Sequence, residues 1–251
     1  MCKFYRYDKE LKKSKETTLQ TAFPFLMNEK CCVSFVGAGG KSSLIARIAD
    51  WGTLHRKKVL VTTTTHIFRP SSEKLAQNEQ ELEQIWHTGN WAVIGTVDPV
   101  QPQKLQSPKP YWLQRAAELA DLILIEADGS KRLPCKVPAS HEPVILPQTD
   151  VVISVFGLSA LNRPLKDCCF RLEKATELLS VTESHPLTRE HMATIFASGQ
   201  GLRKATNNSE YVVVLNQCDN EDRKNAGEQI SDILCGLDST INHIILTKLH
   251  P

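Results

Sequence analysis

The chain has 251 residues, of which 41% are hydrophobic and 23% charged, and a formal net charge of +2. This balance suits one globular domain with small additions, and the low net charge disfavours a protein that coats nucleic acid or an anionic membrane. No apolar stretch approaches the ~20 residues that span a bilayer, and residues 1–15 lack the apolar core of a signal peptide. We therefore expect a cytoplasmic protein that binds neither nucleic acid nor a membrane. Homodimer formation is left open.

Short apolar, β-branched runs alternate with helical patterns along the chain. The predicted strands are 31–36, 59–63, 91–96, 122–126, 151–155, 211–215 and 243–246. The predicted helices between them include 41–50, 72–86 and 111–120. The strand runs are apolar nearly throughout rather than alternating, which is typical of a parallel sheet covered on both faces. The sequence therefore predicts a doubly wound α/β fold of the P-loop NTPase type, with helices on both faces of a mostly parallel sheet.

Three segments depart from this alternation. Residues 1–30 are predicted to be an N-terminal extension of a domain that spans 31–251. Residues 129–149 contain four prolines and read as a long ordered loop, a kind of segment that is usually functional or disordered. Residues 172–202 hold two helical patterns without an intervening strand, which indicates a small helical insertion.

The eight cysteines do not form a metal-binding pattern. No Cys-x-x-Cys pair occurs, and the two vicinal pairs lack the spacing of zinc ligands. We expect reduced, mainly structural thiols, and the role of the pair Cys168-Cys169, in redox chemistry or selenium transfer, is left open.

The first predicted strand leads through a glycine-rich turn directly into a helix. At such a junction, backbone N–H groups and the positive end of the helix dipole favour a phosphate. Lys41 is placed to reach β- and γ-phosphates, and Ser42 to offer its hydroxyl to Mg²⁺. Phe35 stands where the usual G-x-x-x-x-G-K-[ST] pattern has glycine, so the motif is the shorter G-x-x-G-K-S, similar to the loop of Mur-type ligases. We predict a nucleoside triphosphate site formed by Gly37, Ala38, Gly39, Gly40, Lys41, Ser42 and Ser43.

Acidic and hydroxyl side chains follow two neighbouring strands. Glu126 ends the apolar strand 122–126 and Asp128 lies two residues further on, so either can hold Mg²⁺ or orient water in the Walker-B role. Four consecutive threonines, residues 62–65, span the end of the strand 59–63, and Thr64 or Thr65, of which we choose Thr65, is a candidate for a second Mg²⁺ ligand. The predicted catalytic residues are Lys41, Glu126 and Asp128, and the predicted metal ligands are Ser42, Thr65, Glu126 and Asp128.

A late strand ends in Leu215-Asn216-Gln217-Cys218-Asp219, which resembles the Asn-Lys-x-Asp motif that reads guanine in GTPases. The carboxylate of Asp219 would accept hydrogen bonds from two N–H groups on the guanine edge, while Asn216 holds the loop together. Gln217 stands where that motif has lysine. The ligand is therefore predicted to be GTP or ATP, with GTP slightly favoured.

A basic pair, Lys131-Arg132, lies in the long loop shortly after the acidic motif. It can contact a phosphate or an acidic substrate, or it can be part of a solvated loop.

Taken together, these motifs resemble the YqeC family. The resemblance rests on the glycine-rich loop, the threonine run 61–66, the acidic motif 125–131, the tripeptide 141–143 and the late motif 215–219. Members of that family are described as accessory proteins of selenium-dependent molybdenum hydroxylases, or as selenium cofactor biosynthesis proteins. More distantly, the set is similar to P-loop NTPases that load metals into enzymes. The resemblance implies a molybdenum hydroxylase or a selenium-handling protein as partner.

Three functions are compatible with the sequence. The leading hypothesis is a Mg²⁺-dependent NTPase that assists maturation of a molybdenum enzyme. A second is an ATP-dependent ligase or kinase for a small acid, which would consume nucleotide only when an acceptor is present. A third is a nucleotide-sensing module that binds without turnover.

Overall fold

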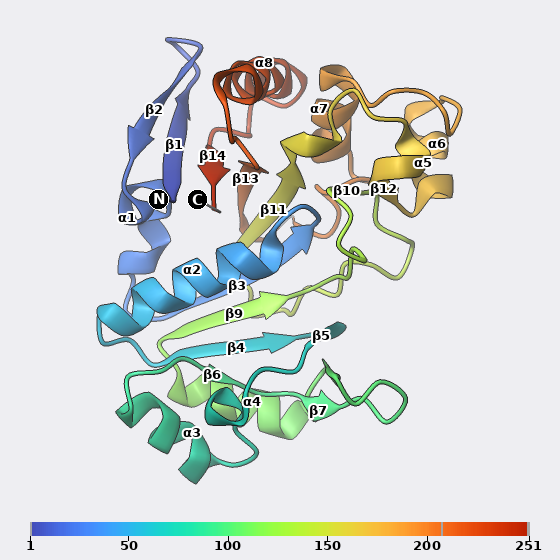
Figure 1. The fold of residues 1–251 in the computed structure, drawn as a ribbon. Coiled ribbons are helices and arrows are strands. Elements are labelled where there is room, and N and C mark those ends of the chain that lie inside the picture. Colours follow the sequence, from blue (N-terminus) through green and yellow to red (C-terminus); the bar gives the residue numbers. More distant parts are fainter. Residues whose placement is uncertain (1, 207, 250–251) are drawn as a thin grey trace.

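The computed structural model describes residues 2–206 and 208–249 and centres on a nine-stranded sheet (Figure 1). The strand order is β2-β1-β14-β13-β11-β3-β9-β4-β6. All strands from β14 to β6 are parallel to their neighbours, whereas β1 pairs antiparallel with both β14 and β2. The prediction of a mostly parallel α/β sheet is confirmed.

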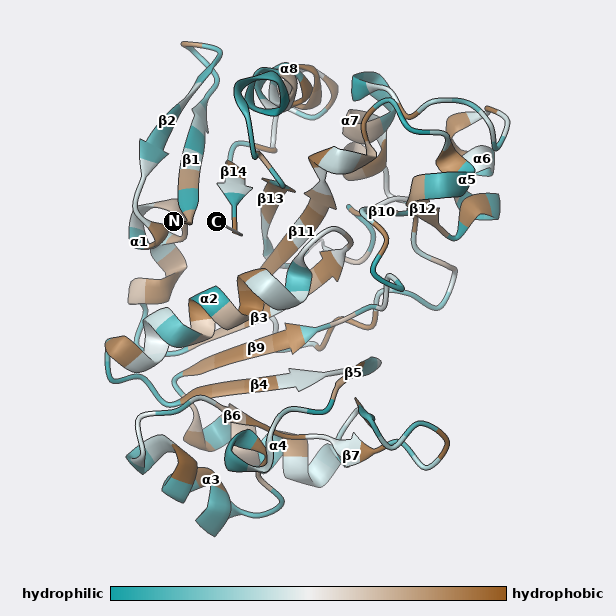
Figure 2. Cartoon of the chain, in the orientation of Figure 1, coloured by the Kyte–Doolittle hydropathy of each residue, from teal (hydrophilic) through white to brown (hydrophobic). Residues whose placement is uncertain are grey.

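The parallel strands coincide closely with the apolar runs of the sequence. Their bounds are β3 (Cys31–Gly37), β4 (Val59–Thr63), β6 (Ala92–Val93), β9 (Leu122–Glu126), β11 (Val151–Gly157), β13 (Glu210–Asn216) and β14 (Ile244–Lys248). Every residue of β3 and β11 is buried, because these central strands are covered on both faces. Figure 2 shows the resulting band of hydrophobic strands through the middle of the molecule.

Helices cover both faces of this sheet, as predicted. On one face α2 (Lys41–Leu54) packs Leu44 and Ile48 against alternate residues of the central strands, such as Phe35. On the other face, α3 (Glu79–His87) and α4 (Pro110–Leu119) cover β4 and β9, and α7 (Arg189–Ala197) and α8 (Glu221–Leu237) cover β11 to β14. The split follows from the two-residue period of a strand, which sends successive side chains to opposite faces.

The predicted N-terminal extension is part of the sheet. Its elements are β1 (Lys3–Asp8), β2 (Lys13–Thr17), α1 (Leu19–Ala22) and the 3₁₀ turn η1 (Pro24–Met27). The buried carboxylate of Glu228 on α8 accepts hydrogen bonds from Lys13 Nζ at 2.9 Å and Ser14 Oγ at 2.7 Å. The hairpin is therefore fixed both by strand pairing and by this polar contact.

The predicted helix 72–86 begins later than expected. Residues Ser72–Lys74 form only a 3₁₀ turn, η2, and α3 starts at Glu79. Asn78 accepts a hydrogen bond from Glu81 N at 2.9 Å, so it caps the helix in place of Ser72. The prediction was wrong because an asparagine cap followed three residues later by glutamate is the stronger start signal.

The predicted strand 91–96 is divided between two sheets. Its first part is β6 in the main sheet. Its last residue begins β7 (Thr96–Val97), which joins a small antiparallel sheet with β5 (His66–Phe68) and β8 (Lys104–Gln106).

The segment after β11 is helical, as predicted for 172–202. It contains η3 (Leu158–Ala160), α5 (Leu165–Cys168), α6 (Leu172–Leu179) and α7, without a strand among the described residues 172–202. Two short strands, β10 (Cys135–Lys136) and β12 (Cys169–Phe170), join the long loop to this helical part. All eight cysteines are free thiols, and Cys135 and Cys169 lie with their sulfur atoms 3.1 Å apart. In the described part of the chain, no helix is both long and apolar enough to cross a membrane.

Candidate functional site

The glycine-rich turn between β3 and α2, residues 37–42, is called the glycine loop below. Gly39 and Gly40 have φ angles of 77° and 125°, in a region that side-chain-bearing residues rarely adopt. A Cβ atom on Gly39 would collide with the backbone of Gly157, and one on Gly40 with the amide of Asn216. The glycines are therefore required both by backbone conformation and by close packing at the ends of β11 and β13.

The glycine loop leads into α2 at Lys41, and Gly40 offers no side chain to cap the helix. The first N–H groups of a helix have no partner inside it. Those of Lys41 and Ser42 therefore open toward the carboxyl edge of the sheet, where the helix dipole adds positive potential.

Lys41 is held inside the site by three groups. Its side chain is only 3% exposed, and Nζ donates to Gly37 O at 2.5 Å and to Asp128 Oδ1 at 2.7 Å. Glu126 Oε1 lies 3.9 Å from the same nitrogen. The fold therefore brings the three predicted catalytic residues together, although they come from the end of β9 and the start of α2.

The two acids of the motif after β9 have different environments. Asp128 is fully buried, accepts hydrogen bonds from Gly37 N at 3.0 Å and from Lys41, and forms an ion pair with Lys136 Nζ at 3.1 Å. Its two oxygens are thus occupied by three protein groups. Asp128 fixes the glycine loop and Lys41, and it is a poorer candidate for a metal ligand than the sequence predicted.

Glu126 is the acid that faces the opening of the site. Its side chain is 13% exposed, and Oε2 accepts a hydrogen bond from Ser42 Oγ at 2.9 Å. Burial raises the pKa of Glu126, and the neighbouring Lys41 and the Ser42 hydrogen bond only partly offset this effect. A buried carboxylate with incomplete compensation is stabilised by an approaching cation.

The oxygens of Ser42 and Glu126 fit a magnesium ion that is shared with a phosphate. Mg²⁺ is usually bound by one or two protein oxygens together with substrate phosphates, rather than by a complete protein cage. Among the described residues, no cluster of three or more His, Cys, Asp or Glu side chains could hold a metal ion by itself. A cation at this position would therefore need oxygens from a ligand.

The threonines after β4 mainly support the neighbouring strand. Thr63 pairs in register with Glu126 and donates from Oγ1 to Glu126 O at 2.8 Å. The hydroxyl of Thr65 lies 3.4 Å from that of Thr63, and no hydrogen bond joins Thr65 to Glu126 or Asp128. The structure thus does not bring Thr65, predicted as a metal ligand, to the carboxylates. His66 belongs to β5 and lies 3.2 Å from Asp98 Oδ2.

The late motif lies on the other side of the glycine loop. Asn216 donates from Nδ2 to Gly39 O at 2.7 Å and accepts from Thr247 Oγ1 at 2.8 Å, so it ties the glycine loop to β13 and β14. Asp219 forms an ion pair with Arg223 at 2.6 Å. The predicted guanine-reading carboxylate is therefore already paired within the chain.

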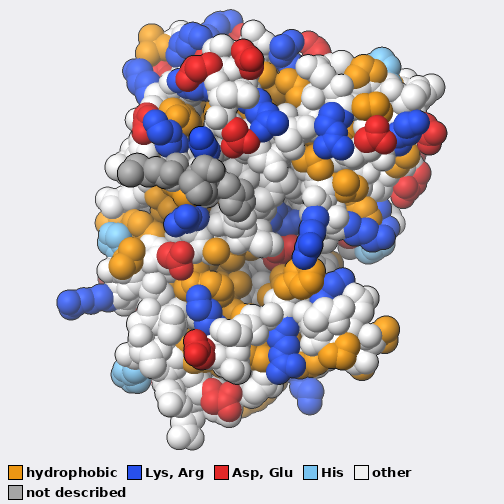
Figure 3. All heavy atoms as spheres, in the orientation of Figure 1, with side chains coloured by type: hydrophobic (Ala, Val, Ile, Leu, Met, Phe, Trp, Pro, Cys, Tyr) orange, Lys and Arg blue, Asp and Glu red, His pale blue; other side chains and the backbone are white. Residues whose placement is uncertain are grey.

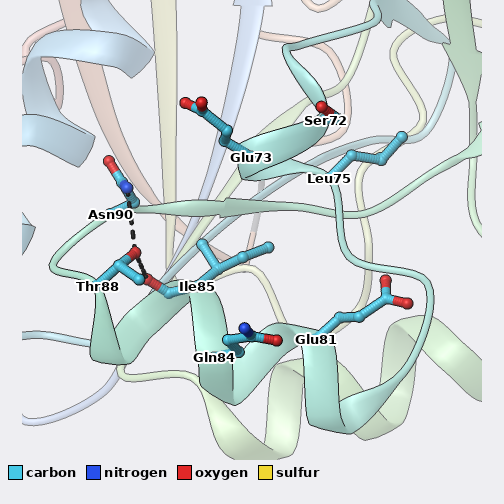
Figure 4. A pocket seen from close by; sticks show the side chains of 8 residues that line it. All are labelled: Ser72, Glu73, Leu75, Glu81, Gln84, Ile85, Thr88 and Asn90. Carbon is cyan, nitrogen blue, oxygen red and sulfur yellow. Dashed lines mark hydrogen bonds between the residues drawn. The ribbon is translucent and has the colours of Figure 1, made fainter.

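A hollow of about 300 Å³ lies next to this motif, between the loop after β11 and the start of α8. Ser159, Asn162, Arg189, Asn220 and Arg223 contribute polar groups to its lining. A second hollow, of about 400 Å³, lies between η2 and α3 (Figure 4). Its lining includes two acids and no Lys or Arg, and it is remote in sequence and fold from the glycine loop.

The sequence predicted neither Lys136 nor Arg171 as a site residue, and Glu142 only as part of the tripeptide 141–143. Lys136 is fully buried and bridges Asp128 to Glu142, with Nζ 2.9 Å from Glu142 Oε2, and Arg171 NH2 lies 3.3 Å from Glu142 Oε1. Burial alone would raise the pKa of Glu142, but the hydrogen bond and charge of Lys136 outweigh it, so this pKa is lowered. Only one local signal pointed to them, namely a lysine between the apolar residues Cys135 and Val137.

The sequence model of a protein family described as "YqeC protein" matches residues 33–173, more than half of the chain. The chain belongs to the YqeC family. A protein of Escherichia coli (strain K12) named "Uncharacterized protein YqeC" is 30% identical over 184 residues, which cover 68% of this chain and 70% of that protein. The family match contains the glycine loop, both acids and the Lys136–Glu142–Arg171 cluster of this YqeC protein, and it ends before Asn216.

Proposed function

We propose that this YqeC protein binds a nucleoside triphosphate with Mg²⁺ and hydrolyses it. The observation that carries the proposal is the convergence of Lys41 and Ser42, at the start of α2, on Glu126, at the end of the adjacent parallel strand β9. Ligands of open parallel sheets bind at this carboxyl edge. Among the described residues, these groups combine the donors for phosphate with oxygens suited to magnesium.

Each group has a distinct role in this proposal. The N–H groups of Lys41 and Ser42 bind phosphate oxygens at the helix start. The ammonium of Lys41 would exchange its contact with Gly37 O for a terminal phosphate while it keeps its ion pair with Asp128. Ser42 and Glu126 would hold the magnesium, which would supply Lewis-acid stabilisation of the phosphate charge. Glu126 also lies on the side from which a water molecule can be oriented.

The strand order supports a position for the nucleoside. Glu126 ends β9 on one side of β3, while Asn216 and the 300 Å³ hollow lie beyond β11 on the other side. A triphosphate along the glycine loop would thus place its base near β13. GTP remains the slightly favoured ligand, and its recognition requires Asp219 to release Arg223.

A role in the maturation of a selenium-dependent molybdenum hydroxylase rests on the family resemblance. If it is correct, such a hydroxylase purified from cells without this protein should be inactive or lack selenium. Full activity and full selenium content would defeat this role without affecting the NTPase proposal.

The direct test is a thermal-shift panel of ATP, GTP and their diphosphates, with and without Mg²⁺, followed by assays of phosphate release. We expect stabilisation by a triphosphate that is stronger with Mg²⁺, and slow release of phosphate without any acceptor. Turnover only with an added acid would favour the ligase or kinase hypothesis, and binding without turnover would favour a sensing module. No stabilisation by any nucleotide would refute the proposal.

A further inference from the structure

A strained basic turn lies directly beside the glycine loop. Leu133 N donates to Ser130 O at 3.0 Å and closes a four-residue turn with Lys131 and Arg132 at its centre. Their φ angles are 48° and 62°, so two consecutive non-glycine residues are left-handed. Turns of this kind favour Asn-Gly, and strained backbone of this sort gathers at functional sites.

Two backbone hydrogen bonds fix this turn above the ends of β3 and β11. Gly39 N donates to Leu133 O at 3.2 Å, and Gly157 N donates to Pro134 O at 2.9 Å. The end of the turn is therefore hydrogen-bonded both to the glycine loop and to the end of β11. The position of Arg132 relative to the loop is set by these contacts and not by a flexible linker.

The side chain of Arg132 reaches across the site. Its guanidinium carbon lies 4.8 Å from the ring centroid of Phe68, which belongs to β5 after the end of β4. β9, which ends in Glu126, lies between β3 and β4. From a backbone held beside Gly39, Arg132 thus extends toward the β4 side of the sheet, the side of β3 on which β9 and Glu126 lie.

Neither cation of the turn has an acidic partner. Lys131 Nζ lies 5.4 Å from the ring centroid of Phe170, and among the described residues no carboxylate is within ion-pair distance of Lys131 or Arg132. By contrast, Lys41, Lys136 and Arg171 are all paired. The face in Figure 3 is hollowed near its middle, and Lys and Arg side chains stand beside this hollow. Unpaired cations on an exposed turn attract anions.

We propose that Arg132 binds the γ-phosphate of the triphosphate on the glycine loop and stabilises its charge during hydrolysis. This inference rests on the proposed function. Water adds to the γ-phosphorus as the bond to the β–γ bridging oxygen breaks, which yields nucleoside diphosphate, inorganic phosphate and one proton released to solvent. Arg132 gives up its exposed contact with Phe68 because charge-assisted, bidentate bonds to phosphate are stronger than such a contact.

The test compares Arg132→Ala with the neighbouring variant Lys131→Ala, which removes one cation from the same strained turn. In Arg132→Ala we expect kcat to fall roughly 1,000-fold, the lower end of what such an arginine contributes, with little change in KM. Diphosphate affinity should be unchanged, and added guanidinium ions should restore part of the rate. Lys131→Ala should retain most activity.

The outcomes separate this inference from the proposed function. If the parent hydrolyses triphosphate and Arg132→Ala is equally fast, Arg132 is not a catalytic residue, although the protein is an NTPase. Equal losses in Arg132→Ala and Lys131→Ala would also overturn the assignment, because they would indicate disruption of the turn. A parent that neither binds nor hydrolyses any triphosphate would refute both proposals.

Discussion

Replacing Lys41 with methionine tests the proposed site most directly. The change keeps the unbranched apolar stem and removes the ammonium that contacts Gly37 O and Asp128. The triphosphate should then lose its main side-chain cation. We expect Lys41→Met to abolish stabilisation by triphosphate while the protein still folds.

The expected magnitudes follow from burial and from ligand linkage. Removing one partner of a buried ion pair lowers the free energy of unfolding by ~3–5 kcal/mol. The lower end of this range applies here, because Asp128 keeps its contacts with Gly37 N and Lys136. For a chain of this size, 1 kcal/mol shifts Tm by about 2–4 °C, so Lys41→Met should melt about 6–12 °C below the parent. Triphosphate at about 100 times its Kd should add roughly 2.7 kcal/mol to the free energy of unfolding of the parent. This corresponds to a rise in Tm of about 5–11 °C, which the variant should not show.

Lys136→Met is the matched control. Lys136 pairs with the same carboxylate, Asp128, through the other oxygen, Oδ2, and it also pairs with Glu142. Its loss should destabilise the protein at least as much as the loss of Lys41, but the upward shift with triphosphate should persist. Differential scanning fluorimetry of both variants, with circular dichroism to confirm folding, gives the comparison.

Two results would refute this reasoning. A folded Lys41→Met protein with the parental shift would show that the lysine does not bind the triphosphate. Loss of the shift in both lysine variants would show that the charge network, and not Lys41 itself, supports binding.

Three further predictions concern the acids. Glu126→Gln should bind nucleotide but lose Mg²⁺-dependent phosphate release. If this variant releases phosphate at the parental rate, Glu126 has no role in hydrolysis. Asp219→Asn should shift the preference from GTP toward XTP in competition binding, because the substitution replaces one hydrogen-bond acceptor with a donor. If neither affinity changes, residues 216–219 do not recognise the base. Folding lowers the pKa of Glu142 below its ordinary value of 4.5. The ion pairs of this carboxylate therefore stabilise the fold fully above pH 4.5, and their contribution is lost as the pH falls through the pKa of the folded state. The stability advantage of the parent over Glu142→Gln in urea unfolding should therefore be largest near pH 6 and shrink toward pH 3, and a constant difference would contradict it.

The sequence by itself determined the local parts of this protein. Apolar runs gave the central strands because residues buried on both faces must be apolar, and β4 and β9 begin and end where predicted. Glycines followed by Lys41 and Ser42 marked the turn into α2, since few other residues allow that backbone path. The acid at the end of β9 was visible for the same local reason.

Only the tertiary structure decided how these parts meet. The pairing of β1 with β14 joins opposite ends of the chain, and the sequence of residues 3–8 does not predict which strand β1 pairs with. The burial of Asp128 against Lys136, the pairing of Asp219 with Arg223 and the reach of Arg132 to Phe68 depend on how loops fold back over the sheet edge. Periodicity and capping encode which face of an element is buried and where it begins. Whether Glu126 or Asp128 faces the opening of the site depends on contacts between segments that are distant in sequence.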